Sequence, residues 1–170
     1  MHAQPLKTRT PRKTPQPQAP EQSPKPEDEG RRNELIAKSA QLFREKGYDK
    51  TTVRDIAAAV GMQAGSWFYH FKTKQDILMA VMEQGLERSL EAIETISVQP
   101  LPPREMFRRM VLAHLNTLLA PNHHFIPVLL YEGRSLDQPA RTKIGVLTNR
   151  YEALWDQVID ALYRSGDWLG

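Results

Sequence analysis

Apolar residues recur at helical spacing along most of the chain. Ile36, Ala40 and Phe43 are separated by four and three residues, which places them on one face of a helix that Gly47 ends. Similar spacing, with glycine, proline or a capping threonine at the ends, predicts further helical segments. They cover residues 53–60, 64–71, 73–97, 104–119, shorter pieces of 122–135, and 139–164. No window alternates as a half-buried strand would, so the pattern predicts an all-α fold.

The first 30 residues lack this pattern. They hold seven of the thirteen prolines and almost no large apolar residue, and their first half is purely basic (Lys7, Arg9, Arg12 and Lys13). Such a segment buries too little apolar surface to order itself, so residues 1–30 are predicted to be a disordered Pro-rich basic tail. Residues 31–91 and 92–170 are then interpreted as two helical domains.

Residues 61–78, GMQAGSWFYHFKTKQDIL, crowd five rings into one short stretch. On a helix, Trp67 and Phe71 lie four residues apart on one face, with Phe68 partly beside them, so this face is expected to pack on the preceding helices. Tyr69 and His70 fall on the other side together with Ser66. Two short helices joined by a turn that contains glycine predict a helix-turn-helix over residues 52–71.

The outward face of this segment has the chemistry needed to meet DNA. Its hydroxyls, amide and imidazole can bond to base edges, and Lys72 and Lys74, which follow it, can hold phosphates. The preceding helix starts with a capping-box pattern, Thr52 with Asp55 three residues later, and carries Arg54 in its first turn. The positive end of that helix suits a phosphate.

The charge distribution fits an anionic partner. The net charge is +3 overall, +5 over residues 31–75 and −3 over residues 76–170. A basic block beside an acidic one is typical of nucleic-acid binding, although a solvated charged surface explains it equally well. No signal peptide or long apolar run is present, so a cytoplasmic protein without a membrane partner is expected.

Enzyme and metal chemistry are poorly supported by the sequence. Ser66 and His70 are four residues apart, but no carboxylate that would orient the imidazole is evident, and both lie on the face assigned to DNA. There is no cysteine, and His123 and His124 are adjacent, so on a helix they point about 100° apart. We therefore expect neither a catalytic site nor a metal or other cofactor.

One stretch resembles the DNA-binding domain of the TetR family of bacterial transcriptional regulators. The matching residues are Thr51-Thr52-Val53-Arg54-Asp55-Ile56-Ala57, then Gly61, Gly65-Ser66, and Phe68-Tyr69-His70-Phe71-Lys72-x-Lys74. The resemblance implies backbone contacts from Thr52 and Arg54, and a phosphate clamp from Lys74. It implies base or phosphate contacts from Tyr69 and His70, preceded at the groove-facing start of the recognition helix by Gln63, Ala64, Gly65 and Ser66.

Two positions depart from the family pattern. Trp67 stands where a smaller aliphatic residue is commoner, which implies rearranged packing under the recognition helix. Phe68 stands where many members have a tyrosine that donates to a phosphate, so that contact is expected to be lost.

The resemblance further implies a C-terminal helical domain that binds a small apolar effector and forms a homodimer. The candidate effector contacts are Met110, His114, Phe125, Tyr131, Arg134 and Trp155, although most apolar members fit a plain core equally well. The family dimer uses two long C-terminal helices, and only one, residues 139–164, is predicted here. The expected function is a repressor that binds a palindromic operator as a dimer and is released by the effector. The alternative is a monomer that binds DNA weakly or serves as an interaction module.

Overall fold

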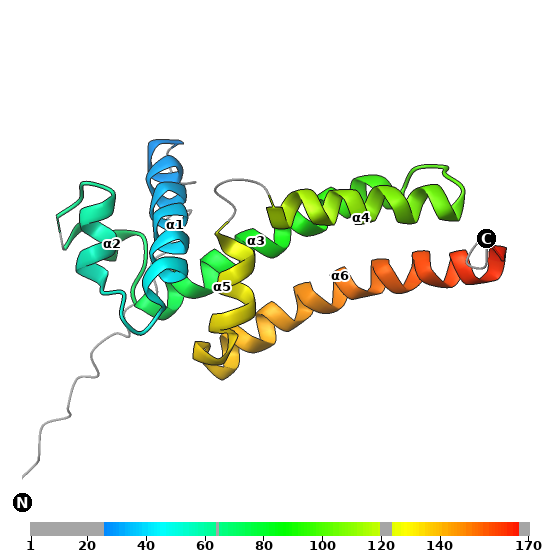
Figure 1. Cartoon of the computed structure of the whole chain (residues 1–170). Coiled ribbons are helices and arrows are strands. Elements are labelled where there is room, and N and C mark those ends of the chain that lie inside the picture. The colour runs from blue at the N-terminus through cyan, green and yellow to red at the C-terminus, as the bar shows by residue number, and fades with distance from the viewer. Residues whose placement is uncertain (1–25, 64, 120–123, 167–170) are drawn as a thin grey trace, which may run out of the picture.

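The computed structural model describes residues 26–63, 65–119 and 124–166, which contain six α-helices, two 3-10 turns and no strand (Figure 1). The α-helices are α1 (Pro26–Lys46), α2 (Val53–Ala59), α3 (Lys74–Ser97), α4 (Pro103–Leu119), α5 (Phe125–Glu132) and α6 (Gln138–Ser165). The 3-10 turns are η1 (Ser66–Tyr69) and η2 (Gly133–Ser135). The expected all-α class is confirmed.

Helix α1 begins at Pro26, five residues before the helical pattern predicted, so the last part of the supposed tail is helical. Its first turn carries Glu27, Asp28 and Glu29, whose negative charges suit the positive end of a helix. Residues 1–25 lie outside the described residues. The helix ends at Gly47, whose φ of 83° is a left-handed conformation that favours glycine.

The segment expected to be a recognition α-helix over residues 64–71 is instead the single 3-10 turn η1. Three consecutive bulky rings lose side-chain freedom in a helix, and Gly65 before the turn offers no side chain to cap it. The chain becomes extended again at Thr73 (φ −137°, ψ 160°) before α3 starts. Trp67 and Phe71 of the predicted inward face are nevertheless both buried.

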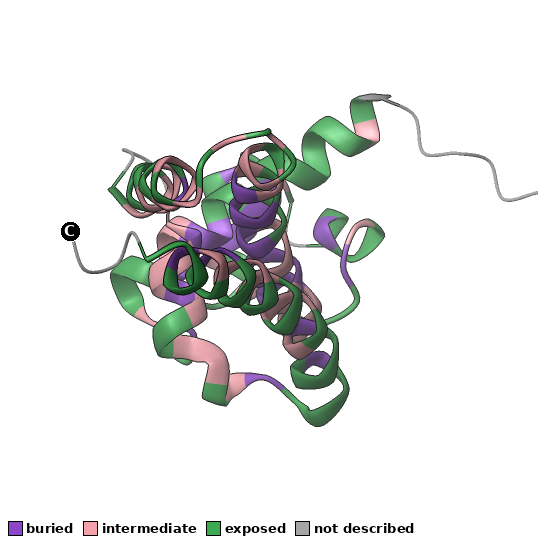
Figure 2. Ribbon diagram, turned by 90° about the vertical axis from the view of Figure 1, so that its right-hand side faces the viewer, coloured by how far each residue is buried: buried purple, intermediate pink, exposed green. Residues whose placement is uncertain are grey.

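Helix α3 connects the two ends of the molecule. α1, α2 and η1 lie around its first turns, and α4, α5 and α6 pack along the remainder (Figure 1). Its buried side chains run from Ile77 to Ile93, and buried residues concentrate on the helices at the centre of Figure 2. The domain boundary predicted after residue 91 falls inside this uninterrupted helix, so the division into domains remains a prediction.

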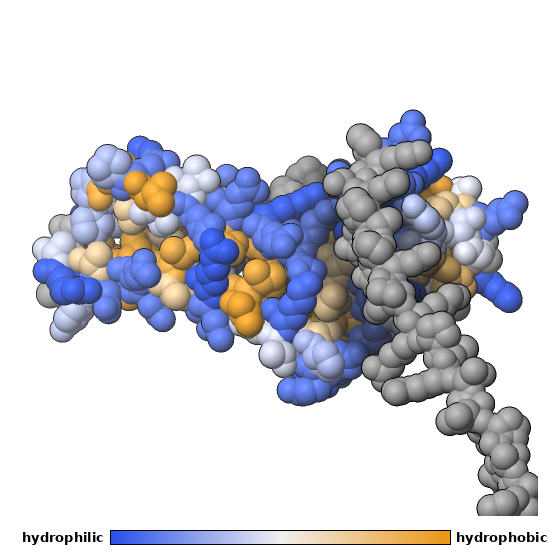
Figure 3. All heavy atoms as spheres, turned by 180° about the vertical axis from the view of Figure 1, so that it is seen from behind, coloured by the Kyte–Doolittle hydropathy of each residue, from blue (hydrophilic) through white to orange (hydrophobic). Residues whose placement is uncertain are grey.

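The α4–α6 end of the molecule is loosely covered. Only Met110 of α4 is fully buried, in a small cluster with Ile93 and Val158. Apolar side chains reach solvent among the polar ones on the face drawn in Figure 3. The exposed large apolar residues on α4 and α6 are Leu112, Leu115, Leu119, Val146, Ile159 and Tyr163.

Helix α5 approaches α3 most closely at Gly85. A Cβ added there would lie 2.5 Å from Cβ of Phe125, whose side chain is itself buried. Such a contact is too short for real atoms, so the absence of a side chain at residue 85 allows α5 to lie where it does.

Replacing Gly85 by alanine should therefore lower the free energy of unfolding by about 1–3 kcal/mol, since the added methyl forces α5 away from α3. Gly145→Ala is the matched control, because it also lies inside a helix but has nothing within 4 Å of the added Cβ. That variant should gain about 0.5–1 kcal/mol from higher helix propensity. Urea denaturation measures both, and equal effects at the two positions would contradict the close packing.

Candidate nucleic-acid interface and internal cavity

The turn η1 and the loop before it present a polar surface to solvent. Gln63, Gly65 and Ser66 are exposed, Tyr69 is 76% exposed, and His70 is half-buried with its ring edge-on to Tyr69. Ala64 lies outside the described residues. The exposed residues of this segment thus flank the buried Trp67, and their part in binding DNA remains a prediction.

Phe68 was expected to lie partly on the buried face with Trp67 and Phe71, but it is exposed. Its ring is 58% exposed and tilts against the ring of Trp67, with 4.4 Å between centroids. The 3-10 turn explains this difference, because three residues per turn rotate position 68 further from the core than an α-helix would.

A capping box fixes the start of α2. The backbone N–H of Asp55 donates to the hydroxyl of Thr52 (3.1 Å), and the Asp55 carboxylate accepts from the Thr52 hydroxyl (2.7 Å) and N–H (2.8 Å). These bonds, the hydroxyl bond first, lower the pKa of the Asp55 carboxyl. A carboxyl whose folded-state pKa lies below its unfolded-state pKa stabilises the fold at neutral pH. This stabilisation is lost as the pH falls through the folded-state pKa. Thr73 and Asp76 form the same box at the start of α3.

The two lysines that follow η1 have different surroundings. Lys74 donates to the carbonyl oxygens of Tyr48 (2.8 Å) and Thr51 (3.1 Å), and its ammonium lies 4.1 Å from the centre of the Tyr48 ring. It ties the loop between α1 and α2 to α3, which the sequence did not reveal. Lys72 is exposed, and its ammonium has no hydrogen bond or ion pair with another described residue.

Arg54 resembles Lys72 in this respect. It lies exposed on the first turn of α2, and its guanidinium makes no hydrogen bond or ion pair with any residue that the structure describes. Lys46, by contrast, faces the carboxylate of Asp55 at 3.7 Å, and Arg32 stacks over the ring of Phe71 at 4.9 Å. Arg54 and Lys72 are therefore exposed basic groups of the helix-turn-helix region that no described side chain neutralises.

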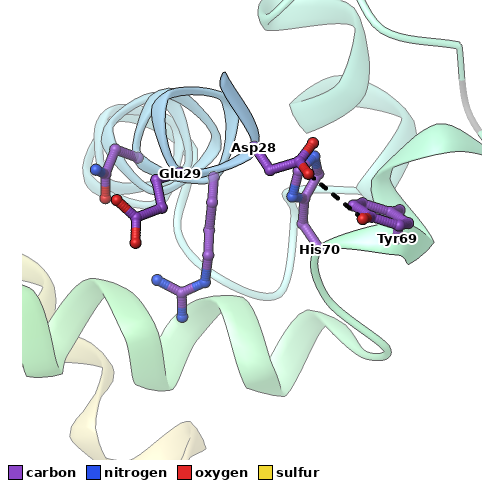
Figure 4. A pocket seen from close by; sticks show the side chains of 6 residues that line it. Asp28, Glu29, Tyr69 and His70 are labelled. Carbon is purple, nitrogen blue, oxygen red and sulfur yellow. Dashed lines mark hydrogen bonds between the residues drawn. The ribbon is translucent and has the colours of Figure 1, made fainter. Parts of the chain in front are cut away.

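An acidic wall adjoins the same surface. The first turn of α1 faces η1 across a hollow of about 610 Å³, lined by Asp28, Glu29, Tyr69 and His70 together with Arg32 and Asn33 (Figure 4). The phenol of Tyr69 points at Asp28 and donates to its carboxylate over 3.5 Å (Figure 4). A polyanion that approaches Tyr69 must displace this contact.

A second hollow lies between the four helices α3, α4, α5 and α6. It is a cavity of about 520 Å³, and its wall is mostly apolar. The lining residues are Leu86, Ser89, His114, Thr117, Leu118, Ile126, Leu129, Leu130, Thr148, Tyr151, Glu152, Trp155 and Asp156. A cavity of this size and polarity suits a small organic molecule.

Of the six effector contacts expected from the sequence, only His114 and Trp155 line this cavity. Met110 is fully buried in the core, and Phe125 packs on Gly85. Tyr131 and Arg134 are exposed outside it. The spacing that identified apolar faces does not reveal which faces leave a gap.

Tyr151 is the principal lining residue that the sequence did not single out. Its hydroxyl lies 2.6 Å from Nδ1 of His114. Burial raises the pKa of its phenol, and a hydrogen bond from Trp155 partly offsets this effect. The three rings pack together, with centroids 5.8–6.3 Å apart.

Helix α5 joins this cavity to the loop between α1 and α2. Ile126 and Leu129 line the cavity, whereas Glu132, at the end of the same helix, accepts a hydrogen bond from the backbone N–H of Tyr48 (3.1 Å). Immediately after α5, the carbonyl of Ser135 accepts a hydrogen bond from the side chain of Gln75. The loop that Lys74 holds is thus also held by α5.

The described residues contain no group of three or more His, Asp or Glu side chains that could hold a metal ion. In the same part of the chain, each helix is too short or too polar to cross a membrane.

Comparison with known proteins identifies relatives of both halves of the chain. Residues 35–81 match the family of bacterial regulatory proteins described as the tetR family. The HTH-type transcriptional repressor KstR2 of Rhodococcus jostii (strain RHA1) is 29% identical over 82% of this chain and 68% of its own length. Across the KstR2 repressors found, this chain spans 63–68% of their length.

Solved structures share the fold. The tetR family regulator PfmR of Thermus thermophilus has a TM-score of 0.72 and 29% identity, covering 78% of this chain and 71% of PfmR. A protein described as superantigen PfiT has a TM-score of 0.72 and 36% identity, covering 81% of this chain and 73% of PfiT. The likeness thus extends from the helix-turn-helix into the cavity-forming helices.

The positions of the two lysines predict different effects on stability. Lys74→Met should lower the free energy of unfolding by about 1–3 kcal/mol, because two loop carbonyls lose a charged donor. Lys72→Met should change it by less than about 0.5 kcal/mol, as is usual at an exposed site without partners. Chemical denaturation distinguishes the two, and an unchanged stability for Lys74→Met would rule out its anchoring role.

Proposed function

This chain belongs to the tetR family of bacterial regulatory proteins, and on that premise we propose that it is a repressor controlled by a small ligand. In this proposal η1 and its flanking loop enter the major groove of an operator, and the ligand occupies the cavity between α3 and α6. The observation that carries the proposal is the pair of exposed, unneutralised cations, Arg54 and Lys72, which precede and follow an exposed polar turn in the sequence.

The residues of this surface divide into three roles. Arg54 and Lys72 hold phosphates, because their charges are exposed and uncompensated. Base edges are contacted by the residues between them in the sequence, namely Gln63, Ala64, Gly65, Ser66, Tyr69 and His70. Thr52 and Lys74 act mainly by fixing backbone, since the capping box and the loop carbonyls engage them.

We propose that two copies bind together on a palindromic site. A dimer of helix-turn-helix units reads half-sites about 34 Å apart, one helical turn of DNA. A single unit has half the contacts, and non-specific binding of this kind has a Kd of about 10⁻⁴ to 10⁻⁶ M at physiological salt. A specific repressor therefore needs the second copy, and a monomer corresponds to the alternative function of weak DNA binding.

In this proposal, the position of α5 explains how a ligand in the cavity causes the protein to release DNA. A ligand pressed against Ile126 and Leu129 favours one placement of α5, and Glu132 transmits that placement to the N–H of Tyr48. The same loop is bonded to Lys74 and leads directly into α2. The ligand then acts by binding one of two arrangements more tightly, which is the requirement for allosteric control.

Arg54→Ala and Lys72→Ala should each weaken binding to DNA of any sequence. Each should also reduce the slope of log K against log salt concentration by about one, because one phosphate contact is lost. Fluorescence anisotropy at several salt concentrations measures both quantities. Arg164→Ala is the control, since it also removes one positive charge but lies in the last turn of α6. Affinity that stays unchanged in both test variants, with folding intact, would refute the proposed interface.

Glu132→Ala should weaken operator binding by about 2- to 30-fold although it lies outside the interface, which corresponds to about 0.5–2 kcal/mol of coupling. The amide of Tyr48 loses its acceptor, so its hydrogen exchange should accelerate in the same variant. Arg134→Ala, an exposed neighbour, is the matched control. If Glu132→Ala and Arg134→Ala behave alike in both assays, α5 does not carry the coupling.

A further inference from the structure

The serine and threonine hydroxyls that line the α3–α6 cavity donate their protons within their own helices. Each donates to the carbonyl oxygen four residues earlier on its own helix, at 2.9–3.1 Å. The pairs are Ser89 to Gly85, Thr117 to Ala113, and Thr148 to Ile144. A hydroxyl has a single proton, so a ligand in the cavity meets these groups as hydrogen-bond acceptors. Ser89 is 5% exposed, so its oxygen lies in the wall of the cavity and not at a solvated rim.

The charged groups of the cavity are acceptors too. Glu152 and Asp156 lie one turn apart on α6, where both residues line the cavity and are also exposed to solvent. Neither carboxylate has a hydrogen bond or ion pair with another described residue. No lysine or arginine lines the cavity within the described part of the chain. Earlier on α6, Lys143 and Arg150 are bonded to glutamates of α3 and do not neutralise this pair.

Donors, in contrast, are scarce. The phenol of Tyr151 and the imidazole of His114 lie 2.6 Å apart and bond to each other, which uses one of their two protons. The indole N–H of Trp155 is engaged by Tyr151. The wall therefore offers several oxygen acceptors, two negative charges and the rings of Tyr151 and Trp155. A carboxylate, phosphate or thioester-linked anion would find few partners there and would be repelled by Glu152 and Asp156.

We propose that this cavity selects hydrophobic amines, bound in the protonated form, over neutral and anionic molecules of the same size. The ammonium N–H groups donate to the carboxylates and to the wall oxygens, and the aromatic rings attract the positive charge. The apolar body lies against Leu86, Ile126 and Leu129. The inference rests on the proposed function only in treating this cavity as the effector site.

Isothermal titration of the DNA-free protein at pH 7 with three eight-carbon probes tests it: octylamine, 1-octanol and octanoate. Octylamine should bind at least about tenfold more tightly than octanoate, with 1-octanol between them, because only the head-group charge differs. In the double variant Glu152→Gln/Asp156→Asn the ratio of the amine and carboxylate affinities should fall toward one. Glu91→Gln, an exposed carboxylate on α3 that does not line the cavity, controls for net charge and should keep the wild-type ratio.

Binding of octanoate as tight as that of octylamine, or failure of all three probes to bind, would overturn the proposal. So would a preference for the amine that survives in the double variant, since the carboxylates would then not be its source. These titrations contain no DNA, so their failure leaves the operator-binding proposal standing. Conversely, a chain that binds no operator would still show the charge preference if the cavity is as described.

Discussion

The close approach of α5 to α3 at Gly85 is the constraint on which the rest of the structure depends. Because residue 85 has no side chain, Phe125 lies directly on the α3 backbone, and the eight-residue α5 is held between the two ends of the molecule. Its middle then forms one wall of the cavity, while Glu132 at its end reaches the loop before α2. One short helix thereby contacts both the cavity and the loop before α2, and the proposed coupling between the two sites depends on it.

The cations of the N-terminal part serve two different purposes. Lys74 donates hydrogen bonds to two carbonyls of the loop before α2 and so fixes that loop to the start of α3. Arg54 and Lys72 remain exposed without described partners, so their charges are available to a polyanion. The cavity has the opposite character, with two unpaired carboxylates and no described cation in its wall. The division of charge between the two halves of the sequence thus reappears in the structure, as exposed cations in the N-terminal part and carboxylates at the cavity.

Features set by neighbouring residues could be predicted from the sequence. The capping box of Thr52 and Asp55, the end of α1 at Gly47 and the burial of Trp67 and Phe71 all follow from local spacing. The spacing predicts an α-helix where residues 66–69 form a 3-10 turn. Spacing alone does not include the side-chain entropy that three adjacent aromatic residues lose in an α-helix. The anchoring by Lys74 and the cavity position of Tyr151 depend on partners 23 to 37 residues away, which periodicity does not reveal.

The most direct test of the central claim is to recover random DNA fragments with the purified protein at physiological salt and to sequence them. A paired reading surface built around η1 predicts enrichment of one motif with two inverted half-sites about one helical turn apart. Arg54→Ala in parallel should remove the enrichment. Recovery without any motif, or a motif equally enriched by the Arg54→Ala variant, would contradict the account of this chain as an operator-binding repressor.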